Sequence, residues 1–294
     1  RYQVKRKTPG NFNDSIKIAV CPWELPQWPE EAKFVFRDIN YFWAATNFIK
    51  NAFKDIFPNE KIFHAPPAVH IDEIHLEEFD VRLIEGEFVF LTVFDGLSSI
   101  SRKNPIASIR AFQRAFVRGE NVKLVVKTMN FNNNSDELNE LAQLIRSDGR
   151  IELVNEKLTK SDLFKLVKSC HSFISLHRSE GFGRNIAEAM LFKRPVIVSA
   201  FSGNLDFCFA ENSYLVEGEL VPVKKGEYWY SDGQKWFDAS VEHAAQQMYE
   251  VFINREVAFE KAERAYKYMS TYHSIQSTGE RYSQLLSQIA NNLL

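Results

Sequence analysis

One stretch of the sequence constrains the fold more than any other. Residues 172–176 form an apolar run followed by polar residues, as at the end of a buried strand, and a turn with two glycines follows at residues 181–183. Helix-forming residues occupy positions 185–192, and a proline then opens a second apolar strand at residues 196–198. A strand, turn, helix and strand in this order form a βαβ unit, whose two strands are parallel. The sequence therefore predicts a parallel α/β sheet.

The helix of such a unit begins at the carboxyl edge of the sheet. Its first N–H groups have no partner within the helix and its dipole is positive at this end, so an anion such as phosphate can bind there. Two carboxylates flank this position, Glu180 before the glycines and Glu188 on the second turn of the helix. Glu180 can reach a group attached to the anion, and Glu188 can reach two adjacent hydroxyls. Taken alone, the same pair also fits a helix cap and a solvated helix residue.

From residue 86 the chain alternates between strand and helix patterns. The sequence predicts strands at residues 88–94, 123–126 and 151–154 and helices at residues 104–118, 135–147 and 159–168. This order implies a doubly wound sheet, in which ligands bind at the carboxyl ends of the strands. The loop expected at residues 95–103, with Arg102 and Lys103, therefore lies at the same edge as Glu180 and Glu188.

Shorter patterns lie on either side of this region. Strands are expected at residues 16–20, 41–45 and 61–64, with a helix at residues 47–57 that Thr46 caps. The loop between the first two strands contains Trp23 and Trp28, which either line a sugar site or pack within the loop. Residues 217–240 form an irregular stretch rich in aromatics, and the chain from residue 241 onward is expected to be helical.

The composition makes several classes of function improbable. A formal net charge of −2 over 294 residues gives no reason to expect a nucleic-acid partner. The three scattered cysteines fit a reducing, cytoplasmic setting, and the seven histidines show no metal-ligand spacing. No apolar run approaches the length of a membrane span, and no signal peptide is visible. Because Arg1 is not a start methionine, we expect the chain to be a piece of something longer.

Several linked motifs resemble one family. The spacing of Glu180 and Glu188, the residues 175–179 before them and the residues 202–207 after them resemble the Glu-x7-Glu region of glycosyltransferase family 4. This resemblance implies an α/β fold of the GT-B type, with two Rossmann-like domains facing a cleft and the N-terminal one incomplete. The resemblance also implies three parts of the chain. Residues 1–70 would be the second half of the N-terminal, acceptor-side domain with a hinge, and residues 71–272 the nucleotide-sugar-binding domain. Residues 273–294 would form a helix that crosses back to the N-terminal domain.

The resemblance also implies an activity. It indicates a retaining glycosyltransferase that moves a sugar from a nucleoside-diphosphate sugar to a glycan or lipid-linked acceptor, in surface polysaccharide or glycoconjugate synthesis. No cofactor and no metal are expected, because fixed cations and helix N–H groups replace the metal ion. The enzyme would be cytoplasmic. A peripheral contact with the inner membrane face stays open, with the stripe Arg110, Arg114 and Arg118 as its candidate, although a solvated helix face explains that stripe equally simply.

The roles of the site residues follow from the same resemblance. Glu180 would orient the donor sugar, Lys103 and Arg102 would bind the diphosphate, and Glu188 would hold the ribose hydroxyls. The nucleotide would lie against the segment between the two glutamates, which consists of Gly181, Phe182, Gly183, Arg184, Asn185 and Ile186. Family members more often carry an arginine earlier in the first loop, so the role of Arg102 stays open.

Two alternatives to this activity remain. A GT-B fragment or module could bind a nucleotide or glycan without catalysis, and the sequence does not separate this case from an enzyme. The chain could also be another nucleotide-sugar enzyme of the same fold, such as an epimerase. This alternative lacks support, because those families carry different acidic and histidine signatures. The donor base and sugar, the acceptor and the oligomeric state are not determined by these residues.

Overall fold

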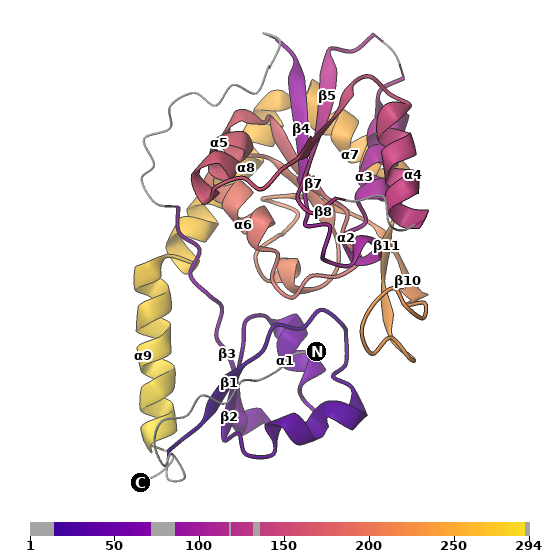
Figure 1. Ribbon diagram of the computed structural model, residues 1–294. Coiled ribbons are helices and arrows are strands. Elements are labelled where there is room, and N and C mark those ends of the chain that lie inside the picture. The colour runs from indigo at the N-terminus through magenta and orange to yellow at the C-terminus, as the bar shows by residue number, and fades with distance from the viewer. Residues whose placement is uncertain (1–14, 72–85, 118, 132–135, 292–294) are drawn as a thin grey trace.

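The computed structural model describes residues 15–71, 86–117, 119–131 and 136–291. A large parallel sheet with helices on both faces fills the upper part of Figure 1, and a small parallel sheet lies below it. Helix α9 (Ile275–Asn291) runs beside the small sheet. Among the described residues, no helix combines the length and the apolar character that a bilayer crossing requires.

The large sheet has six strands in the order β6-β5-β4-β7-β8-β9, all parallel. The strands are β4 (Phe88–Val93), β5 (Val122–Thr128), β6 (Ile151–Asn155), β7 (Ser172–Ser175), β8 (Val196–Ser199) and β9 (Tyr214–Val216). The predicted doubly wound sheet is confirmed. Because the chain order reverses between β4 and β7, the carboxyl ends of these two neighbours flank the switch point, where such folds bind ligands.

The helices of this part cover both faces of the sheet. They are α2 (Ile100–Lys103), α3 (Pro105–Ala115), α4 (Asp136–Arg146), α5 (Lys160–Ser169), α6 (Arg184–Leu191), α7 (Val241–Ile253) and α8 (Arg255–Tyr272). One hydrophobic core contains residues of α3, α4 and α7, and a second core contains residues of α5, α6 and α8. The sheet is thus buried on both sides, as its nearly continuous apolar strands require. The first residue expected in the second predicted helix, Ser135, lies outside the described residues.

The small sheet is built around aromatic side chains. Its elements are β1 (Ile18–Val20), η1 (Glu30–Phe36), β2 (Tyr41–Ala44), α1 (Asn47–Ala52), η2 (Asn59–Lys61) and β3 (Ile62–His64). Each strand is slightly shorter than predicted. Thr46 caps α1 by accepting a hydrogen bond from the Ile49 N–H at 3.2 Å, as expected. The helix ends at Ala52 rather than near residue 57, and Phe53 then stacks on Phe42 with ring centroids 4.2 Å apart.

The loop expected at residues 95–103 contains a short helix, α2. Ser99 caps it by accepting a hydrogen bond from the Arg102 N–H at 3.1 Å. The helix ends at Asn104, whose φ of 50° lies in the left-handed region that asparagine tolerates, directly before Pro105. Four residues are too few to produce a helical pattern in the sequence, so this prediction was wrong.

The aromatic-rich stretch at residues 217–240 is also more regular than predicted. It forms an antiparallel hairpin from β10 (Gly218–Pro222) and β11 (Lys235–Ala239). The loop between the two strands, residues 223–234, is too long to carry the two-residue turn signal by which hairpins are recognised. In Figure 1 this hairpin projects from the large sheet toward the small one.

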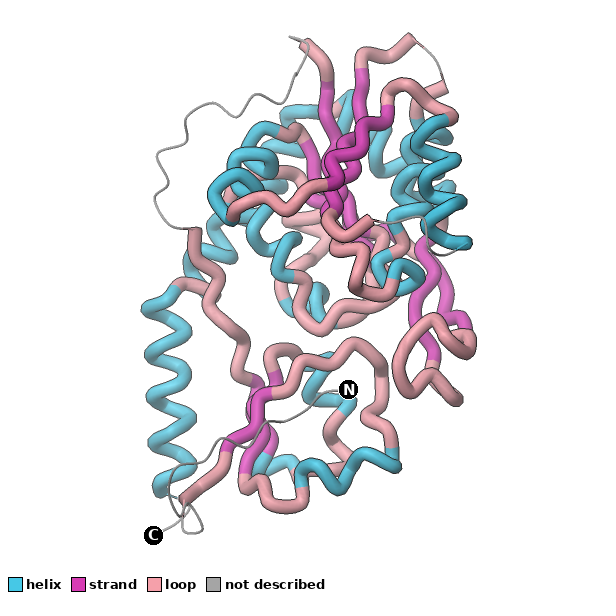
Figure 2. The backbone as a smooth tube through the Cα atoms, in the orientation of Figure 1, coloured by secondary structure: helices cyan, strands magenta, loops and turns pink. Residues whose placement is uncertain are grey.

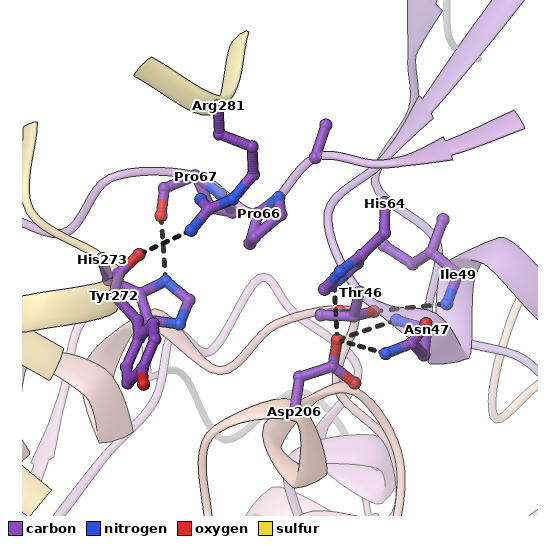
Figure 3. Close-up of polar contacts among 12 residues, drawn as sticks. Thr46, Asn47, Ile49, His64, Pro66, Pro67, Asp206, Tyr272, His273 and Arg281 are labelled. Atoms are coloured by element: carbon purple, nitrogen blue, oxygen red, sulfur yellow. Dashed lines mark hydrogen bonds and ion pairs between the residues drawn. The ribbon is translucent and has the colours of Figure 1, made fainter. Parts of the chain in front are cut away.

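Two segments connect the parts, and they are bonded to each other. One is the loop after β3, drawn in pink in Figure 2, and the other is the junction of α8 and α9. The Val69 N–H donates to the His273 carbonyl at 2.8 Å, and the His273 Nδ1 lies 3.2 Å from the Pro67 carbonyl oxygen (Figure 3). Farther along α9, the Tyr282 ring packs 4.8 Å from the Trp43 ring. The two connecting segments therefore lie together on the same side of the small sheet.

The loops after β7 and β8 touch through glycine. The Gly203 N–H donates to the Glu180 carbonyl at 2.9 Å, directly after Ser202, whose φ is 77°. A Cβ at Gly203 would lie 2.1 Å from the Gly181 carbonyl oxygen, so no other residue fits without moving the backbone. The position of the loop that carries Glu180 thus depends on this contact.

Replacing Gly203 with alanine should push the two loops apart. The added Cβ would meet backbone atoms, which cannot rotate away as a flexible side chain can. We expect the free energy of unfolding to fall by about 1–3 kcal/mol, the usual range for an overpacked site, in a urea denaturation experiment. Gly149→Ala is the matched control, because a Cβ there meets no atom of the described residues within 4 Å. An unchanged midpoint for Gly203→Ala would contradict the close contact.

Candidate functional site

Three charged side chains meet at the carboxyl ends of β4 and β7. Lys103 Nζ lies 2.5 Å from Glu180 Oε1, and Arg102 Nη1 lies 3.3 Å from the same oxygen. Arg102 Nη1 also donates to the Ser179 carbonyl at 2.9 Å. Helix α2 supplies both cations and the loop after β7 supplies the carboxylate. The structure therefore brings together the three residues that the sequence placed at this edge, and we call them the ion cluster.

The ion cluster holds Glu180 in its charged form. Its side chain is only 12% exposed, and this burial raises the pKa, but the charges of Lys103 and Arg102 outweigh it and lower the pKa to about 2. At neutral pH the carboxylate therefore accepts hydrogen bonds and cannot donate a proton. Because two cations share this one carboxylate, the ion cluster keeps a net positive charge.

Arg102 has a second set of neighbours on its other side. Its Cζ lies 5.7 Å from the centre of the Tyr228 ring, and the Tyr228 hydroxyl donates to Glu24 Oε2 at 2.5 Å. Burial lowers the pKa of Arg102, but Glu180 and Glu24 raise it by more, so the guanidinium stays charged. These contacts connect the large sheet, the hairpin loop and the loop before β2. Sequence reasoning missed Tyr228 and Glu24, because only the fold brings them to Arg102.

A buried polar group supports the loop that carries Glu180. His177 Nε2 lies 2.9 Å from Asn204 Oδ1, and Asn204 Nδ2 donates to the Ser199 carbonyl at 3.0 Å. Ser202 Oγ accepts a hydrogen bond from the Glu180 N–H at 2.9 Å. Complete burial lowers the pKa of His177, so its imidazole is neutral at neutral pH. In the sequence these polar residues lie at or after the ends of predicted strands. That position alone did not assign them a role.

Helix α6 begins beside the ion cluster. Gly183 precedes it with a φ of 94°, and no side chain in the described part of the protein caps this end. Arg184 and Asn185 open the first turn, while Ile186 is buried in the core. Phe182 packs on Phe207 with ring centroids 5.0 Å apart, and on His273. The uncapped N–H groups at the start of α6 can bind an anion.

Glu188 is buried on the second turn of α6. Only 6% of the residue is exposed, and this burial raises the pKa of the carboxyl group, although Arg184 and Lys160 partly oppose the rise. Among the described residues, none donates a hydrogen bond to it, and it does not belong to the ion cluster. A carboxyl group on a largely buried residue, with a raised pKa and beside the start of α6, is a candidate for a ligand contact, because ligand hydroxyls can donate to its oxygens.

The small sheet reaches the same loops. The Thr46 hydroxyl donates to the Gly181 carbonyl at 2.8 Å. Figure 3 shows Asp206 accepting hydrogen bonds from the Asn47 N–H and Nδ2 at 2.9 and 3.2 Å, with His64 Nε2 at 2.7 Å. Nothing in the sequence pattern of these residues indicated that they would meet. The contacts fix how the small sheet faces the ion cluster.

Other candidates from the sequence lie elsewhere. Arg110 pairs with Glu140 at 2.5 Å on the surface, which favours the solvated face, and Arg118 lies outside the described residues. Trp23 and Trp28 pack on each other with ring centroids 4.7 Å apart. The described residues contain no group of three histidine, cysteine or acidic side chains that could hold a metal ion.

The chain resembles known proteins in sequence and in structure. Residues 82–227 match a family model described as glycosyl transferases group 1. No curated protein sequence matches the chain. A glycosyltransferase from Rickettsia africae ESF-5 has a similar structure, with a TM-score of 0.71 and 16% identity over 94% of this chain and 71% of that one.

Two further solved structures are similar. A point mutant of S. aureus TarM, in complex with fondaparinux, α-GlcNAc-glycerol and UDP, has a TM-score of 0.66 and 16% identity over 92% of this chain and 50% of that one. Anabaena HepE, in complex with UDP and glucose, has a TM-score of 0.67 and 15% identity over 92% of this chain and 71% of that one. The chain therefore spans half the length of TarM. These likenesses confirm the expected α/β fold of the GT-B type.

Replacing Glu180 with glutamine should make the free energy of unfolding depend less on pH below about pH 4.5. The pKa of Glu180 is about 2 in the folded protein, below its ordinary value of 4.5, so the carboxylate stabilises the fold above pH 4.5. This contribution disappears as the pH falls toward 2, and the gap between the two values corresponds to about 3 kcal/mol. The free energy of unfolding, measured in urea from pH 2 to 7, should therefore fall less steeply in Glu180→Gln.

The matched control for this titration is Glu242→Gln, which changes an exposed glutamate in the first turn of α7. Its curve should follow that of the unchanged protein. Parallel curves for Glu180→Gln and the unchanged protein would show that the ion cluster does not keep this carboxylate charged.

Proposed function

Because residues 82–227 belong to the glycosyl transferases group 1 family, we propose that the chain transfers a sugar from a UDP-sugar to a glycan or lipid-linked acceptor. The transfer retains the configuration of the sugar. The similar structures of the TarM mutant and of HepE were both determined with UDP, which supports this donor base. The observation that carries the proposal is the ion cluster beside the uncapped start of α6, at the switch point of a parallel sheet.

The diphosphate of the donor would bind between α2 and α6. Lys103, whose side chain is 20% exposed, can turn from Glu180 to a phosphate oxygen, and the N–H groups of Gly183 and Arg184 lie at the start of α6. Arg102 is buried and held by the Ser179 carbonyl, so it contributes a fixed positive charge rather than a mobile ligand. Such fixed charges stabilise the leaving diphosphate without a metal ion.

The remaining roles fall to the two glutamates. Glu180 would accept hydrogen bonds from hydroxyls of the donor sugar, because its low pKa keeps it ionised. Glu188 would accept hydrogen bonds from the ribose hydroxyls, which would satisfy its buried carboxyl group. In the reaction the bond between C1 of the sugar and the diphosphate oxygen breaks, the acceptor oxygen forms a new bond to C1 on the same face, and the proton of the acceptor hydroxyl passes to the departing diphosphate. We place this reaction in the cytoplasm, in the synthesis of a surface polysaccharide or glycoconjugate.

Replacing Glu188 with alanine should weaken the binding of UDP. Each charge-assisted hydrogen bond to a ribose hydroxyl contributes about 1.5–3 kcal/mol, so the loss should be readily measured by isothermal titration calorimetry. Glu242→Ala, on the surface of α7, should bind UDP like the unchanged protein. An unaltered dissociation constant for Glu188→Ala, in a protein whose melting temperature is preserved, would remove Glu188 from this role.

Replacing Glu180 with glutamine should lower turnover and leave UDP affinity in place. Glutamine keeps the size and one acceptor oxygen of the side chain but removes the charge, so the comparison isolates the charge. We expect turnover to fall on the order of 100-fold, about 2.7 kcal/mol of barrier. Donor hydrolysis and sugar transfer are both measured, with calorimetry of UDP in parallel.

Near-normal turnover in Glu180→Gln would reduce the residue to a structural support of its loop. If the unchanged protein binds UDP but neither transfers nor hydrolyses the donor sugar, the non-catalytic binding module replaces the proposed activity.

A further inference from the structure

A cavity of about 680 Å³ lies between the hairpin loop and the loop that precedes β2. One wall comes from residues near Trp28 and from the end of α1, and the other comes from residues 225–234. Its volume lies in the range of sites that bind small molecules or short oligomers. Neither glutamate of the proposed donor site belongs to its lining.

The lining combines aromatic rings with hydrogen-bonding groups. Trp28, Tyr228 and Tyr230 supply the rings, and Gln27 and Gln234 supply amides. A sugar ring offers C–H groups that pack on an aromatic face and hydroxyls that both donate and accept hydrogen bonds. The cavity therefore offers aromatic faces for the C–H groups of a sugar and hydrogen-bonding partners for its hydroxyls.

Tyr230 is held in an unusual position within this wall. Its φ is 52°, which is rare for a bulky residue, and 48% of the residue is exposed. Its ring lies 6.5 Å from the Trp23 ring, across the boundary between the two parts. The wall is also tied down, because Gln234 Nε2 donates to the Gln27 carbonyl at 2.9 Å. A strained, exposed aromatic side chain in a fixed wall points to a ligand contact.

The charges of the cavity select among glycans. Its lining contains four carboxylates, Glu30, Glu31, Asp55 and Asp232, and two lysines, of which Lys33 places its Nζ 2.5 Å from Glu30 Oε2. Carboxylates accept hydrogen bonds from sugar hydroxyls but repel sulfate, phosphate and uronate groups. The chemistry therefore favours a neutral glycan over an acidic one.

One ring of the cavity wall also contacts the ion cluster. Tyr228 belongs to its lining, and the same ring lies 5.7 Å from Arg102 Cζ. Arg102 Nη1 is in turn 3.3 Å from Glu180 Oε1. We infer that this cavity is an acceptor subsite that binds a neutral glycan and directs its end toward the donor sugar. The assignment of this glycan as the sugar acceptor rests on the proposed function, whereas the binding of a neutral glycan in the cavity does not.

The test uses the full 294-residue chain on a panel of immobilised glycans. The panel contains neutral oligosaccharides of hexoses and N-acetylhexosamines, together with sulfated and uronate-containing ones. The unchanged protein should bind neutral members. Tyr230→Ala and Asp232→Ala should each weaken this binding by about 10-fold or more, as for the loss of a central contact. Trp229→Ala is the matched control, because this neighbouring ring is 63% exposed but does not line the cavity.

The thermal shift caused by UDP is measured for every variant and separates the two hypotheses. Lost glycan binding with an unchanged UDP shift in the Tyr230 and Asp232 variants supports the subsite and shows that both variants fold. Glycan binding that survives both substitutions, a preference for sulfated glycans, or no binding of any neutral glycan would overturn it. If the unchanged protein binds neutral glycans through these residues but shows no UDP shift, the cavity is a glycan site and the proposed transferase activity fails alone.

Discussion

The pairing of Glu180 with Lys103 and Arg102 is the interaction on which the site depends. Removing one partner of a buried ion pair costs about 3–5 kcal/mol, and here Lys103 and Arg102 keep the buried Glu180 carboxylate charged. The three residues come from α2 and from the loop after β7, which follow neighbouring strands of the sheet. Their mutual attraction holds α2 against this loop, together with the backbone hydrogen bond from the Arg178 N–H to the Arg102 carbonyl at 2.7 Å. The close contact of Gly203 with Gly181 fixes the same loop from the other side.

Residues next to the ion cluster also join the small sheet to the large one. Thr46 bonds to the carbonyl of Gly181, the residue after Glu180, and Tyr228 links Arg102 to Glu24. Asp206 adds hydrogen bonds to two residues of the small sheet at the other end of this boundary (Figure 3). The loops that carry or border the ion cluster thus also carry contacts between the two parts. A change in one part must alter the surroundings of the ion cluster in the other.

Much of this arrangement follows from local patterns in the sequence, but the contacts that complete the site do not. The strand predicted at residues 88–94, which the structure ends at Val93, the βαβ unit and the cap at Thr46 could be predicted because each depends on residues close together in the chain. The four-residue helix α2 and the hairpin with its long loop were missed, because neither carries a periodic or turn signal. The edge shared by Arg102 and Glu180 could be inferred from the parallel topology. Their pairing, like that of Tyr228 with Glu24, depends on the packed fold.

Arg102 also marks a boundary between two kinds of electrostatic surroundings. On one side lie Lys103 and the positive end of α6, which attract a diphosphate, and on the other lies the cavity beyond Tyr228 with its excess of carboxylates. Charges near the surface act over roughly 8 Å at physiological ionic strength, so each side acts mainly on the ligand nearest to it. An anionic donor would be repelled from the cavity, whereas a neutral glycan would not be. The charge distribution therefore favours an anion on one side of Arg102 and a neutral molecule on the other.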